Sequence, residues 1–231
     1  MKIITILGDS ISMVRPNEGI SLRELYSYKL QENLGSEYYV VNNAIRGSYA
    51  KVQLNNMEDT VLCNNSEVVI IFFGIVDCFP RLFSRTEKLI MAGLSKFKLD
   101  CINKAIIHIK SKNRYFFTKS QKKVYTRVYD FDKIYSDIIL KIEKTGCKQI
   151  ILVNIPSTNE KTKKRNYGVD ENIREYNLII SKQLENKKID LVDLYTITEN
   201  NPNIILEDGH HISKEGHKIL SEILSEKIKI K

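Results

Sequence analysis

The chain has 231 residues, 42% of them hydrophobic, and carries a formal net charge of +8 at pH 7. This length suits one domain, and the apolar fraction is ordinary for a globular protein with a hydrophobic core, which excludes a disordered chain. No apolar run reaches the roughly 18 residues of a membrane-spanning helix, and no secretory signal peptide is recognisable, so a cytoplasmic location is expected.

The chain opens with a predicted strand, helix and second strand. Residues 2–7 form an apolar run that predicts the first strand, and residues 22–34 repeat apolar side chains with a helical period. Ser21 precedes this helix as a predicted N-cap, and Glu24 completes a capping box. A second, short strand is predicted at residues 38–41.

A long segment separates the third predicted strand from the fourth. Residues 68–73 are consecutive apolar residues, which is typical of a strand buried on both faces. The next strand is predicted only at 149–155, and a crossover needs far fewer residues than lie between the two. Within this segment, helices are predicted at residues 86–93, 95–111 and 132–145, whereas residues 112–130 are polar, basic and rich in Tyr and Phe. We interpret the excess as an enlarged, basic helical insertion at about residues 79–132 of a single domain spanning residues 1–231.

The remaining elements complete an alternating pattern. A helix is predicted at residues 172–184, a fifth strand at 190–194, and a final helix at 213–228 with Ser213 as its N-cap. Strands that alternate with helices favour an α/β fold, here a three-layer α/β/α sandwich with a mainly parallel five-stranded sheet. In such sheets, ligands bind beyond the carboxyl ends of the strands.

The positive charge is concentrated in one segment. Residues 81–129 hold thirteen Lys or Arg and only two acids, Glu87 and Asp100, so this segment carries +11 and the remaining chain −3. One interpretation is a lysine-rich, solvated helix surface. The other is an electropositive wall that attracts an anionic substrate, and contact with an anionic membrane surface is a further alternative. No nucleic-acid-binding motif accompanies the segment, so no nucleic acid partner is expected.

The cysteines and histidines favour neither disulfides nor a metal. The four cysteines form no C-x-x-C pair and have no histidine at metal-ligand spacing, so we expect them to be reduced and mostly buried. Four residues near the C-terminus could in principle bind a metal, namely Asp208, His210, His211 and His217. Nothing else in the sequence supports a metal site. We therefore expect neither a metal nor a cofactor, and we interpret His217 as structural and His210 as a loop residue.

Two short motifs supply the groups that serine hydrolysis requires. Gly8-Asp9-Ser10 follows the first predicted strand, and Asp208-Gly209-His210-His211 lies near the C-terminus. A serine hydroxyl is a poor nucleophile until an imidazole takes its proton, and a carboxylate fixes the tautomer of that imidazole. Alone, Ser10 also fits an N-cap at a strand-to-helix turn. The Asp-x-x-His pair makes a Ser10–His211–Asp208 triad the favoured interpretation.

With two further blocks, these motifs resemble those of the SGNH (GDSL) hydrolase superfamily. The blocks are a lone glycine after the second strand, Gly47, and Gly74-x-x-Asp77 after the third. The resemblance spans residues 2–220 and implies a flavodoxin-like sandwich. It implies that Ser10 is the nucleophile, His211 the base and Asp208 its partner, and that the Ser10 and Gly47 N–H groups bind the oxyanion. Asp9 and Asp77 are expected to order the turns beside these residues.

The third block departs from the pattern of the superfamily, which has Gly-x-Asn-Asp with the asparagine as a third oxyanion donor. Val76 occupies the asparagine position, and valine donates no hydrogen bond. Three alternatives follow. Another side chain replaces the donor, with Asn42, Asn43 or Arg46 as candidates; or the enzyme works with two donors on an activated ester; or the protein hydrolyses nothing.

Two longer stretches are similar to those of a bacterial subgroup of the superfamily, whose members often lie in gene clusters for surface polysaccharides. These stretches are residues 8–15 and 74–81. The resemblance implies that Val76 is a trait of the subgroup and that Arg15 and Arg81 belong to the substrate site.

The sequence thus favours a serine esterase that removes a small acyl group, most readily O-acetyl, from a carbohydrate or related ester. The substrate is a small molecule or a glycan, anionic if the basic segment attracts it. Acyl transfer to a sugar hydroxyl is the first alternative. A non-hydrolytic protein for glycan binding or assembly is the second. The oligomeric state is not indicated.

Overall fold

The computed structural model describes residues 1–96, 99–185 and 189–229. Its sheet has five strands in the order β2-β1-β3-β4-β5, and every neighbouring pair is parallel. The strands are β1 (Lys2–Gly8), β2 (Tyr38–Asn42), β3 (Val68–Phe72), β4 (Gln149–Val153) and β5 (Ile189–Val192). The predicted three-layer α/β sandwich is confirmed, and the sheet is wholly parallel among the described residues.

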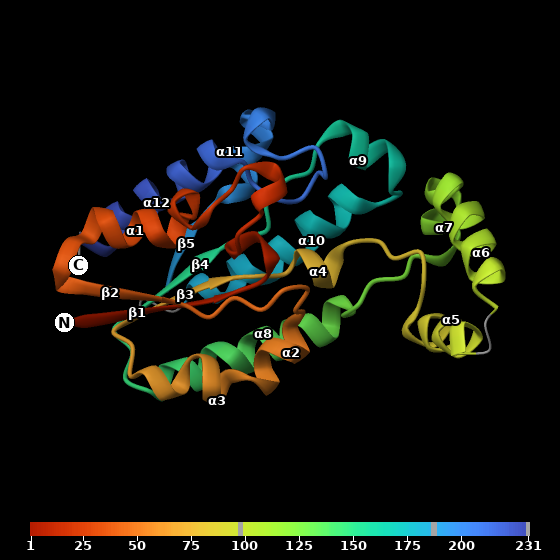
Figure 1. Cartoon of the computed structure of the whole chain (residues 1–231). Helices are drawn as coiled ribbons and strands as arrows, with labels where there is room; N and C mark the ends of the chain where they lie inside the picture. Colours follow the sequence, from red (N-terminus) through yellow and green to blue (C-terminus); the bar gives the residue numbers. More distant parts are fainter. Residues whose placement is uncertain (97–98, 186–188, 230–231) are drawn as a thin grey trace.

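Helices cover both faces of the sheet (Figure 1). On one face lie α1 (Tyr26–Leu34) and α12 (Lys214–Lys229), which pack against each other. On the other lie α2 (Ala50–Asn55), α3 (Met57–Thr60) and α8 (Val128–Glu143), and α10 (Val169–Lys182) packs beside α8. Every side chain of β3 and β4 is buried, as expected for a parallel sheet covered on both faces. The remaining helices of the sandwich are the short α4 (Ile75–Cys78), α9 (Glu160–Arg165) and α11 (Leu194–Asn200).

The helix ends near the termini follow the predicted caps. The predicted helix 22–34 begins as a 3₁₀ turn at Leu22–Glu24, and the α-helical part starts at Tyr26. The Glu24 carboxylate accepts a hydrogen bond of 3.0 Å from the Ser21 backbone N–H, as a capping box requires. Ser213 precedes α12, and its hydroxyl accepts the Gly216 N–H at 3.4 Å.

The basic insertion folds into three helices, α5 (Arg85–Lys96), α6 (Asp100–Lys112) and α7 (Arg114–Gln121), which form a lobe beyond the carboxyl ends of the strands (Figure 1). The sequence did not predict α7, because its aromatic and basic residues show no clear helical period. Residues 97–98, which the predicted helix 95–111 includes, lie outside the described residues, and with them Lys98 of the basic segment.

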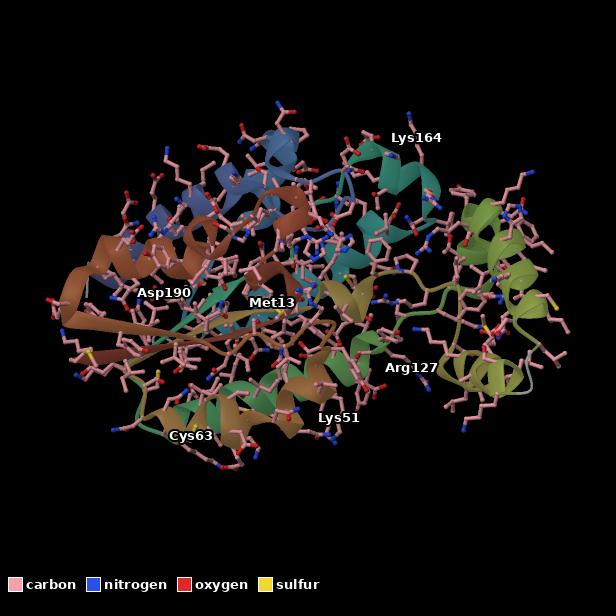
Figure 2. The ribbon with its side chains drawn as sticks, viewed as in Figure 1. Met13, Lys51, Cys63, Arg127, Lys164 and Asp190 are labelled. Atoms are coloured by element: carbon pink, nitrogen blue, oxygen red, sulfur yellow. The ribbon has the colours of Figure 1, made fainter. Side chains whose placement is uncertain are left out.

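All four cysteines are free, but they are not mostly buried as expected. Cys78 and Cys147 are buried, whereas Cys63 and Cys101 are exposed. Cys63 lies at the outer side of the layer formed by α2, α3 and α8 (Figure 2). None of the described helices is long and apolar enough to cross a membrane.

Gly74, two residues beyond the end of β3, is a glycine that the fold requires. Its φ is +137°, and an added Cβ would lie 2.8 Å from Cδ1 of Ile155. Gly74→Ala is therefore expected to lower the free energy of unfolding by about 1–3 kcal/mol through backbone strain and overpacking. The measurement is chemical denaturation.

Gly93→Ala is the matched control, because nothing lies within 4 Å of a Cβ at this position in α5. Alanine is the better helix former by about 1 kcal/mol, so this variant is expected to be neutral or slightly stabilised. Equal losses in the two variants would contradict the assigned role of Gly74.

Candidate active site

Ser10 lies just beyond the end of β1, an interior strand of the sheet. β1 finishes at Gly8, and a 3₁₀ turn at Ser10–Ser12 follows at once. Asp9 caps this turn, since its Oδ1 accepts the Ile11 backbone N–H at 2.9 Å. The cap holds the Ser10 side chain at the carboxyl edge of the sheet, where ligands of parallel sheets bind.

The predicted triad residues form one chain of hydrogen bonds. Ser10 Oγ lies 3.0 Å from Nε2 of His211, and Nδ1 of His211 lies 2.7 Å from Oδ2 of Asp208. Oδ1 of Asp208 accepts the backbone N–H groups of His210 and His211, both at 3.1 Å. Burial alone would raise the pKa of Asp208, but the hydrogen bond from His211 and the neighbouring imidazoles outweigh it, and the pKa lies below its usual range. The carboxylate is thus ionised and oriented toward the imidazole.

Arg15 contacts the same imidazole nitrogen as Ser10. Its Nη1 donates to Nε2 of His211 at 3.0 Å, and its Nη2 donates to Asp208 at 3.1 Å and to Glu18 at 2.7 Å. Nε2 has one lone pair, so the guanidinium competes with the Ser10 hydroxyl for it. Arg15 thus holds both the His211 imidazole and the Asp208 carboxylate in this arrangement.

Ser10 and Gly47, the two residues expected to supply backbone oxyanion donors, line the same pocket. Gly47 lies in the loop after β2 with φ +68°, a left-handed conformation that favours glycine. Within the described part of the chain, the N–H groups of Ser10 and Gly47 have no protein acceptor. The two N–H groups thus belong to residues of the pocket wall and are not engaged by the described protein.

The three side chains considered as substitutes for the missing asparagine are engaged elsewhere. Asn42 donates to the Ser12 carbonyl at 2.8 Å, Asn43 to the Thr60 carbonyl at 2.5 Å, and Arg46 to the Val14 carbonyl at 3.3 Å. None of them lines the pocket, whereas Val76 does. The pocket wall at this position is therefore apolar.

The Ser10 pocket has a volume of about 420 Å³, within the range of small-molecule sites. Its lining comprises Ser10, Gly47, Ile75, Val76, Phe79, Arg81, Arg114, Tyr125 and His210. Phe79, Arg114, Tyr125 and His210 were not identified as site residues from the sequence. The sequence offered two indications of these residues. Arg114 and Tyr125 lie in the basic segment after β3, and His210 is the neighbour of His211.

Asp77 is buried and ties three segments together near the pocket. Its carboxylate accepts the Ala50 backbone N–H at 2.9 Å and the Thr126 hydroxyl, and its carbonyl accepts the Tyr125 N–H at 3.1 Å. Burial raises the pKa of Asp77 to about 6. Its contacts support the ordering role expected from the sequence rather than contact with a substrate.

Asp208, His210 and His211 each present a ligand atom within 4.8 Å of the others. Both ring nitrogens of His211 already bind Asp208 or Ser10, so a metal there would break the triad contacts. His217 is stacked on the ring of Tyr26, with ring centroids 5.8 Å apart, and its Nδ1 accepts the Tyr26 N–H. These contacts fit a structural role for His217 and do not favour a metal centre.

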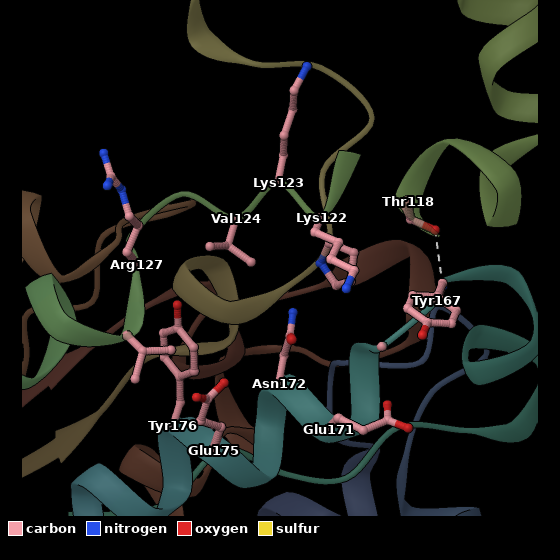
Figure 3. Close-up of a pocket in the computed structure, with 13 residues that line it drawn as sticks. Thr118, Lys122, Lys123, Val124, Arg127, Tyr167, Glu171, Asn172, Glu175 and Tyr176 are labelled. Carbon is pink, nitrogen blue, oxygen red and sulfur yellow. Dashed lines mark hydrogen bonds between the residues drawn. The ribbon is translucent and has the colours of Figure 1, made fainter. Parts of the chain in front are cut away.

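A separate pocket of about 370 Å³ lies between α7, the segment 122–128 and α10 (Figure 3). Glu171, Asn172 and Glu175 of α10 line one side of it, and Asn172 lies opposite Lys122 (Figure 3). It shares no lining residue with the Ser10 pocket. Its lining carries charges of both signs but no serine beside a histidine and a carboxylate.

Comparison with known proteins identifies one family. A model of the GDSL-like lipase/acylhydrolase family matches residues 6–219. No curated protein sequence matches the chain significantly.

Solved structures of esterases and lipases share the fold. The lipase/acylhydrolase from Enterococcus faecalis is 19% identical with a TM-score of 0.68, covering 99% of this chain and 96% of that one. The acetyl xylan esterase AlAXEase is 22% identical with a TM-score of 0.65, covering 99% and 100%. A catalytic mutant of Axe2, an acetylxylan esterase from Geobacillus stearothermophilus, is 17% identical with a TM-score of 0.64, covering 98% and 93%. At these identities the likeness concerns the fold.

Asp9 predicts a pH dependence of stability. The side chain is fully buried, its Oδ2 has no partner among the described residues, and burial, together with the charge of Asp77, raises its pKa to about 7. Between about pH 4 and 7 the native state therefore binds more protons at Asp9 than the unfolded state, and stability falls as pH rises. Asp9→Asn removes this titration and retains an acceptor for Ile11.

Urea denaturation across this pH range measures the effect. The free energy of unfolding of the wild type relative to Asp9→Asn is expected to decline with rising pH, by on the order of a few kcal/mol, and to level off above pH 7. A difference that stays constant with pH would contradict the buried, protonated state of Asp9.

Proposed function

Because the chain belongs to the GDSL-like lipase/acylhydrolase family, we propose that it is a serine esterase that removes a small acyl group, most readily O-acetyl, from a carbohydrate or related ester. The observation that carries the proposal is the chain of hydrogen bonds from Ser10 through His211 to Asp208 beside a pocket. Two structural neighbours are acetylxylan esterases by name, which favours acetylated carbohydrate as the substrate class.

In this mechanism Ser10 Oγ attacks the acyl carbon while Nε2 of His211 takes its proton. Asp208 holds the Nδ1 proton and stabilises the imidazolium that forms. The free N–H groups of Ser10 and Gly47 donate to the oxyanion. The tetrahedral intermediate then expels the alcohol, which takes the proton from His211. Water activated by the same nitrogen hydrolyses the acyl-serine and restores the hydroxyl.

Arg15 adds one step to this cycle. The guanidinium shares Nε2 of His211 with Ser10 in the resting state, and a protonated imidazole would repel it. Arg15 retains acceptors at Asp208 and Glu18, so it can leave Nε2 without losing all its partners. The proposed role of Arg15 is to hold the Asp208 carboxylate in position.

Acyl transfer remains the alternative activity of the same acyl-serine. A sugar hydroxyl in place of water would take the acyl group, and the first half-reaction would be unchanged. A non-hydrolytic role in glycan binding or assembly is the second alternative, and Val76 is the observation that favours it. A cytoplasmic location and a link to surface polysaccharides stay predictions from the sequence.

Ser10→Ala tests the nucleophile. Without an attacking hydroxyl, kcat/KM for p-nitrophenyl acetate is expected to fall by roughly 1000-fold or more. Ser36→Ala, at an exposed turn after α1, is the control and is expected to match the wild type. Equal rates for Ser10→Ala and the wild type would remove Ser10 from the mechanism.

Val76→Asn tests the oxyanion site. If two backbone donors act alone, a side-chain amide at this position supplies a third, and kcat is expected to rise, by up to about 100-fold. Val76→Ala shortens the side chain without adding a donor and is expected to give no gain. An asparagine variant that is no faster than the alanine variant would show that position 76 does not face the oxyanion.

A further inference from the structure

The Ser10 pocket continues into a second pocket. This neighbour has a volume of about 300 Å³ and shares Phe79, Arg114 and His210 with the first. Its other lining residues are Lys161, Thr162, Arg165, Asn166, Glu207 and Asp208. The combined cleft offers more room than a small acyl group needs, so part of it is available to the alcohol portion of an ester.

Two arginines are held in fixed positions in the Ser10 pocket. Arg81 donates from Nη2 to the Val76 carbonyl at 2.6 Å, and its guanidinium lies 4.1 Å from the ring centre of Tyr125. Arg114 donates to the Pro80 carbonyl at 3.1 Å and to the side chain of Asn166. Both are partly buried, and neutral acceptors orient both guanidinium groups toward the cleft that they line.

Neither arginine forms an ion pair within the described part of the chain, although the Asp77 carboxylate lies close enough to Arg81 to raise the pKa of its guanidinium. Among the described residues, no carboxylate lies within 4 Å of a nitrogen of Arg81 or Arg114, and no acid lines the Ser10 pocket. Burial lowers the pKa of both, and the positive charges of Arg165 and Arg81 lower that of Arg114 further. The Nε of Arg81 is buried without an acceptor.

Such an arrangement is costly for a protein without a ligand. Partly buried charges that are close enough to repel one another destabilise the fold unless an opposite charge joins them. The second pocket has two carboxylates: Asp208 is already bound to His211 and Arg15, and Glu207 forms no ion pair with either arginine among the described residues. A guanidinium pair matches the two oxygens of a carboxylate or phosphate.

We propose that Arg81 and Arg114 form a binding site for an anionic group, a carboxylate or a phosphate, on the alcohol portion of the ester. This inference rests on the proposed esterase function, in which Ser10 holds the acyl portion beside the same two residues. The substrate class is therefore an acylated acidic carbohydrate or sugar phosphate. Arg165, which lies close enough to Arg114 to affect its pKa, extends the positive potential along the second pocket.

Calorimetric binding of three matched sugars tests the site without requiring catalysis. The sugars are methyl glucuronide, methyl glucoside 6-phosphate and the neutral methyl glucoside. The wild type is expected to bind at least one charged sugar tenfold more tightly than the neutral one, and the better of the two charged sugars identifies carboxylate or phosphate. Equal affinity for all three, or no measurable binding of either charged sugar, would overturn the proposal.

Variants assign the preference to the two arginines. Arg114→Gln and Arg81→Gln are each expected to lower the charged-to-neutral affinity ratio by about 10-fold or more, the loss of a charge-assisted contact. Arg114→Lys keeps the charge and is expected to lose less. Lys133→Gln, at an exposed position of α8 that lines neither pocket, removes the same charge and is expected to leave the ratio unchanged. An equal loss in Lys133→Gln, or no loss in both arginine variants, would contradict the site.

Acetate release from the O-acetylated forms of the same sugars separates this inference from the proposed function. Preferential binding of charged sugars without Ser10-dependent acetate release would remove the esterase and leave the anion site. Ser10-dependent release from all three esters at equal kcat/KM would keep the esterase and overturn the anion site.

Discussion

The site depends on one atom, Nε2 of His211. Its lone pair faces the Ser10 hydroxyl and the Arg15 guanidinium, both at 3.0 Å, and the opposite nitrogen of the ring binds Asp208. This contact joins residues that are 201 positions apart in the chain. It forms because β1 is an interior strand of the sheet and the loop before α12 returns to the same carboxyl edge, which brings the two ends of the chain together at Ser10 and His211.

The remainder of the site follows from what surrounds that atom. Gly47 and Ser10 leave two backbone N–H groups unpaired toward the pocket, while Val76 makes the facing wall apolar. In the proposed mechanism an oxyanion would form beside these donors in a partly enclosed space, where such donors act more strongly than in water. Arg81 and Arg114 lie on the same pocket and give it positive potential. Two positive charges of the basic segment thus lie in the same pocket as Ser10.

Sequence and structure agree where local chemistry decides the outcome. The sequence predicted the strand before Ser10, the buried strand β3 and the pairing of Asp208 with His211. The two strands could be predicted because each is a run of mainly apolar residues. Ser10 could be placed because parallel strands share one carboxyl edge. The oxyanion candidates Asn42 and Asn43 could not be judged from sequence. Asn42 is the last residue of β2 and Asn43 follows it, yet their amides donate to the carbonyls of Ser12 and Thr60, partners set by tertiary packing. Arg114 was missed because its place depends on α7, whose aromatic and basic residues conceal the helical period.

The central claim is that Ser10 carries the acyl group, and trapping that intermediate tests it most directly. The protein is mixed with p-nitrophenyl acetate, quenched in acid and digested, and its peptides are analysed by mass spectrometry. One acetyl group is expected on the peptide that contains Ser10, and none on that peptide in the Ser10→Ala variant. Steady hydrolysis with the acetyl group on another residue, or with no acylated peptide at all in a quench faster than turnover, would contradict the claim.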